Sequence, residues 1–266
     1  MSDDAVEVVA PYLRRVLALN PGPMTLEGTN TWLLGDPAHG PVAVLDPGPD
    51  DQAHRRRVLE AVEGRVAVVV LTHRHADHAA GAPALAAGVG CDVRAADPAL
   101  RIGNAGLADG DVLTLAGAEL VVAATPGHTS DSCSLLLRGD DGAVRLLTGD
   151  TVLGRGTTVI AAPDGHLGAY LDSLDRLQRW VAEQRVVELL PGHGPRVPDP
   201  AAWLESYRQH RQERLQQVRS ALAEGARGVE AVVERVYGDV DPSVRPAAEQ
   251  SVRAQLEHLG ALEPDR

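Results

Sequence analysis

The stretch VVVLTHRHADHAAG, residues 68–81, places three histidines and an aspartate directly after a run of aliphatic residues. The core of a protein does not accept such groups alone, because an unpaired polar or charged side chain costs free energy there. His73 and His75 lie two residues apart, so in extended backbone they point to the same side, and Asp77 and His78 follow at once. Imidazole and carboxylate groups are preferred ligands of a cation such as Zn²⁺. This stretch therefore predicts one part of a metal site.

Three later stretches repeat the arrangement. LVVAATPGH ends in His128, VRLLTGD ends in Asp150 and VVELLPGH ends in His193. Each side chain follows an apolar run beside a glycine, where α/β sheets place their ligands. A lone histidine after a strand is more often a core or turn residue, but repetition at four strand ends favours a metal centre. Seven such side chains exceed the three protein ligands of one catalytic zinc site, so we expect two ions and a shared carboxylate.

The first 198 residues alternate apolar runs with glycine and proline, which predicts an α/β domain. Helices are expected over residues 51–62, 77–87 and 167–183, and strands over residues 13–19, 31–34, 42–45, 66–71, 112–115, 120–124, 134–138, 144–147 and 186–190. The stretch GPRVPDP at residues 194–200 breaks this pattern, and helical sequence follows it. We therefore predict a catalytic domain over residues 1–198 and a small helical domain over residues 199–266.

The charge balance limits the partners of the chain. Acidic residues outnumber basic ones by 37 to 25, every basic residue is arginine, and the net charge is −12. Such a chain repels polyanions as a whole, although a metal site could still hold a nucleic acid. Arg208, Arg211 and Arg214 share one face of a predicted helix, where we expect a solvated surface or, alternatively, a contact with substrate.

Other features bear on location and assembly. The sequence has neither a signal-peptide pattern nor an apolar run long enough for a membrane span. Its two cysteines, Cys91 and Cys133, form no disulfide framework, so we expect reduced thiols. These features predict a cytoplasmic protein without a membrane partner, and a homodimer remains open.

The order of the predicted ligands resembles the metallo-β-lactamase superfamily. The H-x-H-x-D-H signature at residues 73–78, the later His128, Asp150 and His193, and Asp46 in VLDPG occur in the order typical of that family. The resemblance implies a four-layer αββα sandwich followed by a small winged-helix-like domain. It also implies that one metal is held by His73, His75 and His128, that the second is held by Asp77, His78 and His193, and that Asp150 bridges them. Two Zn²⁺ ions are expected, with Mn²⁺ or Fe²⁺ as alternatives.

The same resemblance implies a hydrolase in which a hydroxide bridging the metals is the nucleophile, oriented and deprotonated by Asp77. Asp46 would either support a ligand from outside the centre or only form the Asp-Pro-Gly turn. Thr129 and Ser130, with Ser132, would either donate hydrogen bonds to substrate or to a ligating carboxylate, or build a turn. His166 is a candidate proton donor, but an exposed residue at a helix start is the better interpretation.

Two positions narrow the resemblance. Histidine at position 75 favours hydrolysis over the redox chemistry of diiron relatives, which have glutamate there, and Asp150 stands where β-lactam-cleaving enzymes usually have cysteine. The stretch NPGPMTLEGTNTWLLG and the helical tail resemble the group that contains β-lactamase-like protein 2 and its bacterial relatives. That group implies a single-stranded-RNA endoribonuclease. The alternative is a thioester hydrolase of the glyoxalase II type, or a hydrolase of another small ester or lactone. A non-enzymatic DNA- or protein-binding role is least favoured, because structural zinc sites are closed.

Overall fold

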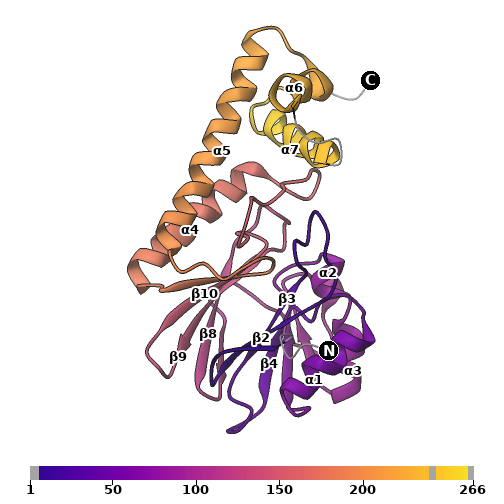
Figure 1. Cartoon of the computed structure of the whole chain (residues 1–266), viewed down its shortest axis with the longest axis vertical. Coiled ribbons are helices and arrows are strands. Elements are labelled where there is room, and N and C mark those ends of the chain that lie inside the picture. The colour runs from indigo at the N-terminus through magenta and orange to yellow at the C-terminus, as the bar shows by residue number, and fades with distance from the viewer. Residues whose placement is uncertain (1–5, 240–243, 263–266) are drawn as a thin grey trace.

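The computed structural model describes residues 6–239 and 244–262 and contains two β-sheets that pack face to face (Figure 1). The first sheet has six strands in the order β1-β2-β3-β4-β5-β6. Its strands are β1 (Val6–Ala10), β2 (Leu13–Leu17), β3 (Asn30–Leu34), β4 (Val42–Leu45), β5 (Val66–Val70) and β6 (Asp92–Arg94). The second sheet has five strands in the order β11-β10-β9-β8-β7. Its strands are β7 (Val112–Leu115), β8 (Ala118–Ala124), β9 (Cys133–Gly139), β10 (Val144–Gly149) and β11 (Glu188–Pro191).

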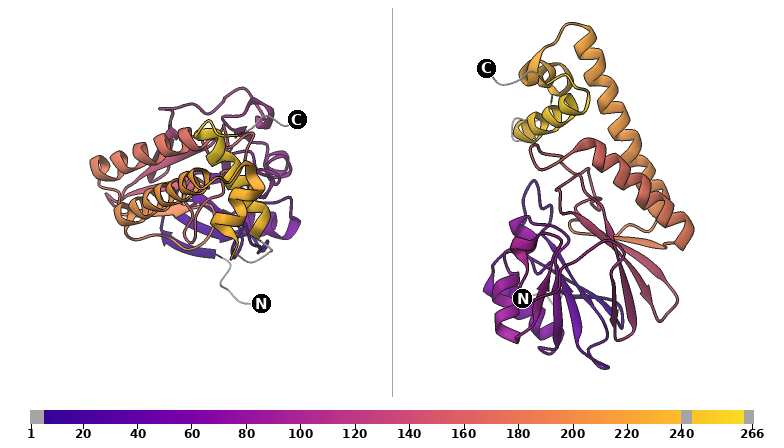
Figure 2. Two further views of the ribbon diagram at one scale, coloured as in Figure 1. Left: turned by 90° about the horizontal axis from the view of Figure 1, so that it is seen from above. Right: turned by 180° about the vertical axis from the view of Figure 1, so that it is seen from behind.

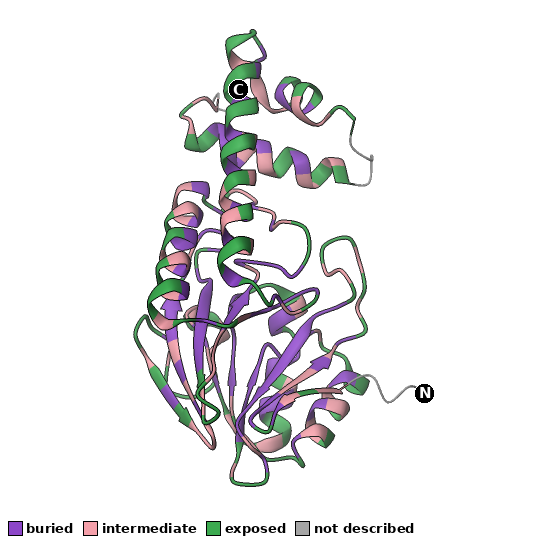
Figure 3. Cartoon of the chain, turned by 60° about the vertical axis from the view of Figure 1, so that its left-hand side comes forward, coloured by how far each residue is buried: buried purple, intermediate pink, exposed green. Residues whose placement is uncertain are grey.

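The alternation of side chains along each strand sorts the core into layers. In β9, Leu135 and Leu137 enter the cluster between the two sheets, whereas Leu136 faces the opposite way. In β3 and β4, Leu34 and Leu45 enter the same central cluster. Successive residues of a strand point to opposite faces, so strands that are aliphatic throughout require cover on both faces. The strands are accordingly buried along most of their length (Figure 3).

Helices provide that cover on the two outer faces. The first sheet packs against α1 (Gln52–Ala61) and α3 (Ala82–Val89), which contribute Val58 and Leu85. The second sheet packs against α4 (Leu167–Gln184) and the first half of α5 (Pro200–Ala223), whose buried residues there include Leu174 and Leu204. The order helix, sheet, sheet, helix is a four-layer αββα sandwich. The predicted fold class is confirmed.

A helical module follows the sandwich and lies at one end of the molecule (Figure 2). It consists of the second half of α5 with α6 (Gly228–Tyr237) and α7 (Arg245–His258). These helices share a core of their own, built from Val218, Val232, Val233, Val252 and Leu256. Because the first half of α5 packs on the sandwich, the division into domains at residue 198 stays a prediction. Within residues 6–239 and 244–262, no helix combines the length and apolar character that crossing a bilayer requires.

The structure differs from the sequence-based elements in two places. The helix expected over residues 77–87 is divided into α2 (Ala76–Ala79) and α3, with the break at Ala80 and Gly81. Gly81 packs against backbone, and a Cβ atom there would lie 2.9 Å from the carbonyl oxygen of Pro49. Strands β1 and β6 were not predicted: β1 is an edge strand on which Val8 is exposed, and β6 has only three residues.

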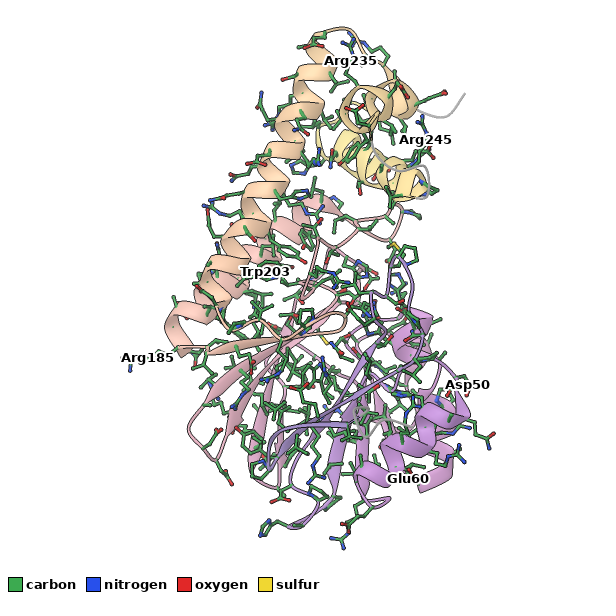
Figure 4. All side chains as sticks on the ribbon, in the orientation of Figure 1. Asp50, Glu60, Arg185, Trp203, Arg235 and Arg245 are labelled. Carbon is green, nitrogen blue, oxygen red and sulfur yellow. The ribbon has the colours of Figure 1, made fainter. Side chains whose placement is uncertain are left out.

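Two aromatic residues of α5 anchor that helix to the sandwich. Trp203, labelled in Figure 4, donates its indole N–H to the carbonyl oxygen of Leu153 at 2.8 Å. The hydroxyl oxygen of Tyr207 accepts a hydrogen bond from the backbone N–H of Leu153, also at 2.8 Å, and this contact is buried. Residue 153 lies four residues after β10, so α5 braces the loop that follows that strand.

We expect Tyr207→Phe to lower the free energy of unfolding by about 1–3 kcal/mol, because the buried N–H of Leu153 loses its acceptor. Ser206→Ala is the matched control, since the hydroxyl of Ser206 is bonded only within its own helix, to the carbonyl oxygen of Trp203. The measurement is denaturant unfolding of both variants beside the wild type. A Tyr207→Phe protein as stable as the Ser206→Ala protein would contradict the bracing role.

Candidate metal centre

The two sheets are tied together at one end, and the predicted ligands lie there. Thr29 forms a β-bridge with His193, and the backbone N–H of Asn30 donates to the carbonyl oxygen of Gly192 at 2.7 Å. On the other side, the N–H of Cys133 donates to the carbonyl oxygen of Thr72 at 2.9 Å. These bonds join strand ends from both sheets. Side chains that are far apart in the sequence are therefore held at one rim.

Three histidines form the first group. The Nδ1 atom of His75 lies 3.1 Å from Nε2 of His73 and 3.0 Å from Nε2 of His128. Two ligand atoms about 2.1 Å from one tetrahedral ion are roughly 3.4 Å apart, so this spacing suits a shared cation. His73 and His128 are buried, whereas His75 is exposed. The group is open to solvent on the side of His75.

The second group contains Asp77, His78 and His193. Nε2 of His193 lies 3.1 Å from Nε2 of His78 and 3.1 Å from Oδ2 of Asp77. Both histidines are completely buried, but the side chain of Asp77 is 30% exposed. The ligand atoms of each group lie within 4.8 Å of one another. This second group can also surround one cation.

Asp150 lies between the two groups. Its Oδ1 atom is 3.4 Å from Nε2 of His78, and its Oδ2 atom is 3.8 Å from Nε2 of His128. Oδ1 is buried and has no hydrogen-bond donor among the residues that the structure describes. A buried carboxylate oxygen without a donor is expensive unless a cation or a water compensates it. The structure thus brings all seven predicted ligands together and puts Asp150 at the position expected of a bridge.

Four of the five imidazoles are fixed through their second nitrogen. The Nδ1 atoms of His128 and His193 donate to the carbonyl oxygens of Val159 and Gly28, at 2.9 and 3.0 Å. Nδ1 of His78 lies 2.9 Å from the Asp46 carboxylate, and Nδ1 of His73 lies 3.0 Å from the Thr72 hydroxyl. Such outer bonds fix the tautomer and turn Nε2 toward the centre, as in many metal sites. His75 differs, because its Nδ1 faces the group.

The charges of the centre compensate one another. Burial lowers the pKa of His73 well below its usual value. Burial also works against protonation of His193, but the Asp150 carboxylate outweighs it and raises the pKa of His193 to about 9. The imidazoles of His78 and His193 in turn overcome burial and hold the pKa of Asp150 well below its ordinary value. The site therefore keeps ionised carboxylates in a buried position, which is the donor set that a divalent cation needs.

Asp46 supports this arrangement from outside the centre. Its carboxylate accepts hydrogen bonds from the backbone N–H and the hydroxyl of Thr72, at 2.8 and 2.7 Å, in addition to its contact with His78. Asp46 has a φ of 51°, a left-handed conformation that aspartate tolerates better than most residues. The turn and the support of a ligand, which were alternatives in the sequence, thus occur in the same residue.

The predicted hydroxyl residues make local contacts. The Thr129 hydroxyl lies 2.7 Å from the hydroxyl of Ser132, and the Ser130 hydroxyl accepts from the guanidinium of Arg74 at 3.1 Å. A role of Thr129 or Ser130 in substrate binding stays a prediction. His166 is exposed and caps α4 by accepting from the N–H of Ala169 at 3.1 Å, as expected of a helix-start residue.

A cleft opens beside His128 and Asp150 and has a volume of about 140 Å³. Its apolar wall consists of Pro23, Met24, Leu26, Leu153 and Val159, and Arg155 and residues 156–158 complete it. No motif in the sequence marks these residues as the wall of a cleft. Only their positions in the sequence hint at a place near the centre. Residues 153–159 begin three residues after Asp150, and residues 23–26 lie in the glycine- and proline-rich stretch before β3.

The arginines predicted to share one face of α5, Arg208, Arg211 and Arg214, do not form the expected solvated face. Arg211 is buried, with 4% of its surface exposed, and its guanidinium donates to the carbonyl oxygen of Thr158. Arg208 binds the carboxylate of Glu205 at 3.1 Å. The helical spacing was correct, but the helical module and residues 157–159 cover the side of α5 that carries Arg211. For Arg211 the expectation of solvent exposure is wrong.

We expect Asp46→Asn to weaken metal binding about 10- to 100-fold, because the neutral amide supports His78 less well than the carboxylate does. Competition between the protein and a chromophoric chelator measures the affinity. Asp50→Asn is the matched control, since Asp50, labelled in Figure 4, is exposed and its described ion pair is a surface contact with Arg55. Equal affinities for the two variants would show that Asp46 serves the turn alone.

Comparisons with known proteins agree with this geometry. Residues 24–209 match the Metallo-beta-lactamase superfamily, and residues 229–263 match the Beta-lactamase associated winged helix domain. The chain is 30% identical to the Beta-lactamase-like protein 2 homolog of Caenorhabditis elegans, a match that covers 96% of this chain and 86% of that protein. It is 32% identical to the Atrochrysone carboxyl ACP thioesterase of Aspergillus chevalieri, over 91% of this chain and 79% of that protein.

A solved structure shows the same fold. The beta-lactamase domain protein from Burkholderia ambifaria superposes with a TM-score of 0.78 and 24% identity, over 98% of this chain and 89% of that one. The layered sandwich, the seven converging side chains and the family match over residues 24–209 lead to one conclusion. The chain belongs to the metallo-β-lactamase superfamily of hydrolases and carries a beta-lactamase associated winged helix domain.

Proposed function

We propose that the protein is a metal-dependent hydrolase of carboxylic thioesters or esters that carry an apolar acyl group. The observation that carries this proposal is the cleft beside His128 and Asp150, whose wall is formed largely by aliphatic side chains. Apolar walls with a few polar groups at one end are typical of small-molecule sites. The acyl chain would lie along Met24 and Leu26, with the carbonyl carbon at the centre.

The donor set fits two divalent cations. The first would be held by His73, His75 and His128, the second by Asp77, His78 and His193, and both by Asp150. Five imidazoles and two carboxylates suit Zn²⁺ and also accept Mn²⁺ or Fe²⁺. When bound, such ions supply an activated water and polarise the carbonyl oxygen of the substrate.

The side chains of the centre have separate tasks. Asp150, buried and held ionised beside His78 and His193, keeps the two groups at a fixed separation. Asp77 is the more exposed carboxylate, at 30% of its side chain against 11% for Asp150, so it would orient the attacking water and accept its proton. The hydrogen bonds of His128 and His193 to backbone carbonyls would keep both rings in place while the proton moves from the water to Asp77.

Single-stranded RNA was the first substrate predicted from the sequence. The arrangement of the arginines on α5 makes it a less favoured substrate than a thioester. Phosphodiester binding requires cations that can reach the backbone of the nucleic acid. Arg208 is paired with Glu205, and Arg211 and Arg214 line one small cavity, which suits a single phosphate and not the successive phosphates of a strand. The similarity to a protein named as an ACP thioesterase also supports thioesters over RNA.

We expect His75→Ala to lower thioester hydrolysis by about 100-fold or more, because the first group loses one of its three ligands. Metal content by mass spectrometry should fall below the two ions per chain expected of the wild type. His39→Ala is the matched control, since His39 is an exposed histidine bound only to Asp36. The substrates are acyl thioesters of several chain lengths, S-lactoylglutathione, and a labelled single-stranded RNA. Cleavage of the RNA with every thioester intact would overturn the proposal and favour the hypothesis of a single-stranded-RNA endoribonuclease.

Met24→Ser tests the apolar wall. We expect kcat/KM for a long-chain acyl thioester to fall about tenfold, near 1.4 kcal/mol, because contact with an exposed apolar side chain is lost. The acetyl thioester should lose far less, since its acyl group does not reach the wall. Val112→Ser is the matched control, because Val112 is as exposed as Met24, at 54%, but lies in β7, outside the cleft. An equal fall in kcat/KM for long and short acyl thioesters would show that the acyl group does not bind along this wall.

A further inference from the structure

A second cavity lies between the sandwich and the helical module. It has a volume of about 220 Å³ and is lined by residues 157–159 on one side and by α5, α6 and α7 on the other. Its polar lining residues are Thr157, Thr158, His210, Arg211, Arg214, Tyr237 and Ser251. At about 30 Å³ per water molecule, the cavity has room for roughly seven waters or a compact polar group.

Arg211 brings a buried charge to this cavity. Its guanidinium lies 5.1 Å above the ring of Tyr170 and donates to the carbonyl oxygen of Thr158. Its Nε–H is buried and has no acceptor. Within residues 6–239 and 244–262, no carboxylate oxygen lies within 4.0 Å of this guanidinium. A buried cation without an anion is unfavourable, so this donor indicates a missing partner.

Other arginines of the helical module have such partners. Arg235 pairs with Glu224 at 2.9 Å, and Arg245 pairs with Glu234 at 3.3 Å, both at the surface (Figure 4). Arg208, one turn before Arg211 on the same helix, pairs with Glu205. Arg211 differs from these three residues because its guanidinium is buried and has no carboxylate partner among the described residues.

The remaining wall of the cavity also favours an anion. The guanidinium of Arg214 lies 4.8 Å over the ring of Tyr237, and its described hydrogen bond goes to the neutral side chain of Gln217. Nδ1 of His210 is buried without a partner. None of the described lining residues is acidic. Two guanidinium groups, an imidazole and the Ser251 hydroxyl thus surround a small space that offers several donors.

We propose that this cavity binds a phosphate group. Guanidinium groups in pairs are typical phosphate ligands, since their planar donors match the oxygens of the anion. Residues 157–159 wall both this cavity and the cleft of the metal centre, so the phosphate would lie one loop away from the reacting bond. If the proposed function holds, we infer that the thioester substrate carries a phosphate on its thiol portion, as a phosphopantetheine group does. Free inorganic phosphate has the same chemistry and is the other source.

The first experiment measures phosphate binding without catalysis. Metal-loaded protein is titrated with inorganic phosphate by calorimetry and by thermal unfolding, against chloride at equal ionic strength. We expect a rise in Tm with phosphate for the wild type, and an affinity at least about tenfold lower for Arg214→Gln, which removes a half-buried guanidinium. Arg208→Gln is the matched control on the same helix and should bind like the wild type. Binding that is unchanged in Arg214→Gln would overturn the proposal, because the phosphate would then sit at the metals or elsewhere.

A second variant separates binding from folding. Arg211→Lys keeps the positive charge but removes the unpartnered Nε–H, and we expect weaker phosphate binding with an unchanged circular dichroism spectrum. Should Arg211→Lys fail to fold, Arg214→Gln still decides the question, because Arg214 is only partly buried. Wild-type affinity in a folded Arg211→Lys protein would contradict the role of the buried guanidinium.

The third experiment distinguishes the two sources of phosphate. The same acyl group is offered on coenzyme A and on N-acetylcysteamine, which lacks phosphate, and the ratio of the two kcat/KM values is compared between proteins. A tenfold fall of this ratio in Arg214→Gln, but not in Arg208→Gln, would assign the cavity to the substrate. A constant ratio with loss of phosphate binding would assign it to free phosphate. If phosphate binds as expected but no thioester is cleaved, the proposed function fails while the phosphate site stands.

Discussion

The hydrogen bonds on the outer nitrogens of four histidines determine what the centre can do. His73, His78, His128 and His193 each use Nδ1 for a contact outside the cluster, with a hydroxyl, a carboxylate or a backbone carbonyl. Those acceptors come from Thr72, Asp46, Val159 and Gly28, in loops that follow or precede strands of both sheets. The same loops carry the bonds that close the two sheets against each other. One set of loops therefore stabilises both the packing of the two sheets and the orientation of the imidazole rings.

Much of this centre could be predicted from the sequence because four of the seven ligands lie within a few residues of the end of an apolar strand. His73, His128, Asp150 and His193 end four such runs, and buried strands fix the place where their ends meet. The break between α2 and α3 could not be predicted, since it depends on the approach of Gly81 to the backbone of residues 47–49, more than thirty residues earlier. Helical periodicity carries no information on that contact.

The surroundings of the centre were harder to predict than its ligands. Arg211 shares a helix face with Arg208 and Arg214, and an arginine on an amphipathic helix is usually solvated. Its burial results from Tyr170 and Thr158, which come from α4 and from an irregular loop. The apolar wall of the cleft likewise combines residues 23–26 with residues 153–159. Loops without periodicity give no sign of what they will face, so the residues that line the cleft could not be found from the sequence.

The continuity of α5 limits how the molecule can move. The helix has 24 residues, about 36 Å at 1.5 Å per residue, and it contributes both to the core of the sandwich and to that of the helical module. No loop interrupts it, so the module cannot hinge at that junction without bending a regular helix. Any widening of the space beside Arg211 would come from α6 and α7 sliding over the far half of α5, or from movement of residues 157–159 on the opposite wall. In the first case, rearrangement of the small hydrophobic core of α5, α6 and α7 would control how a ligand enters and leaves the cavity, while the layers of the sandwich keep their positions.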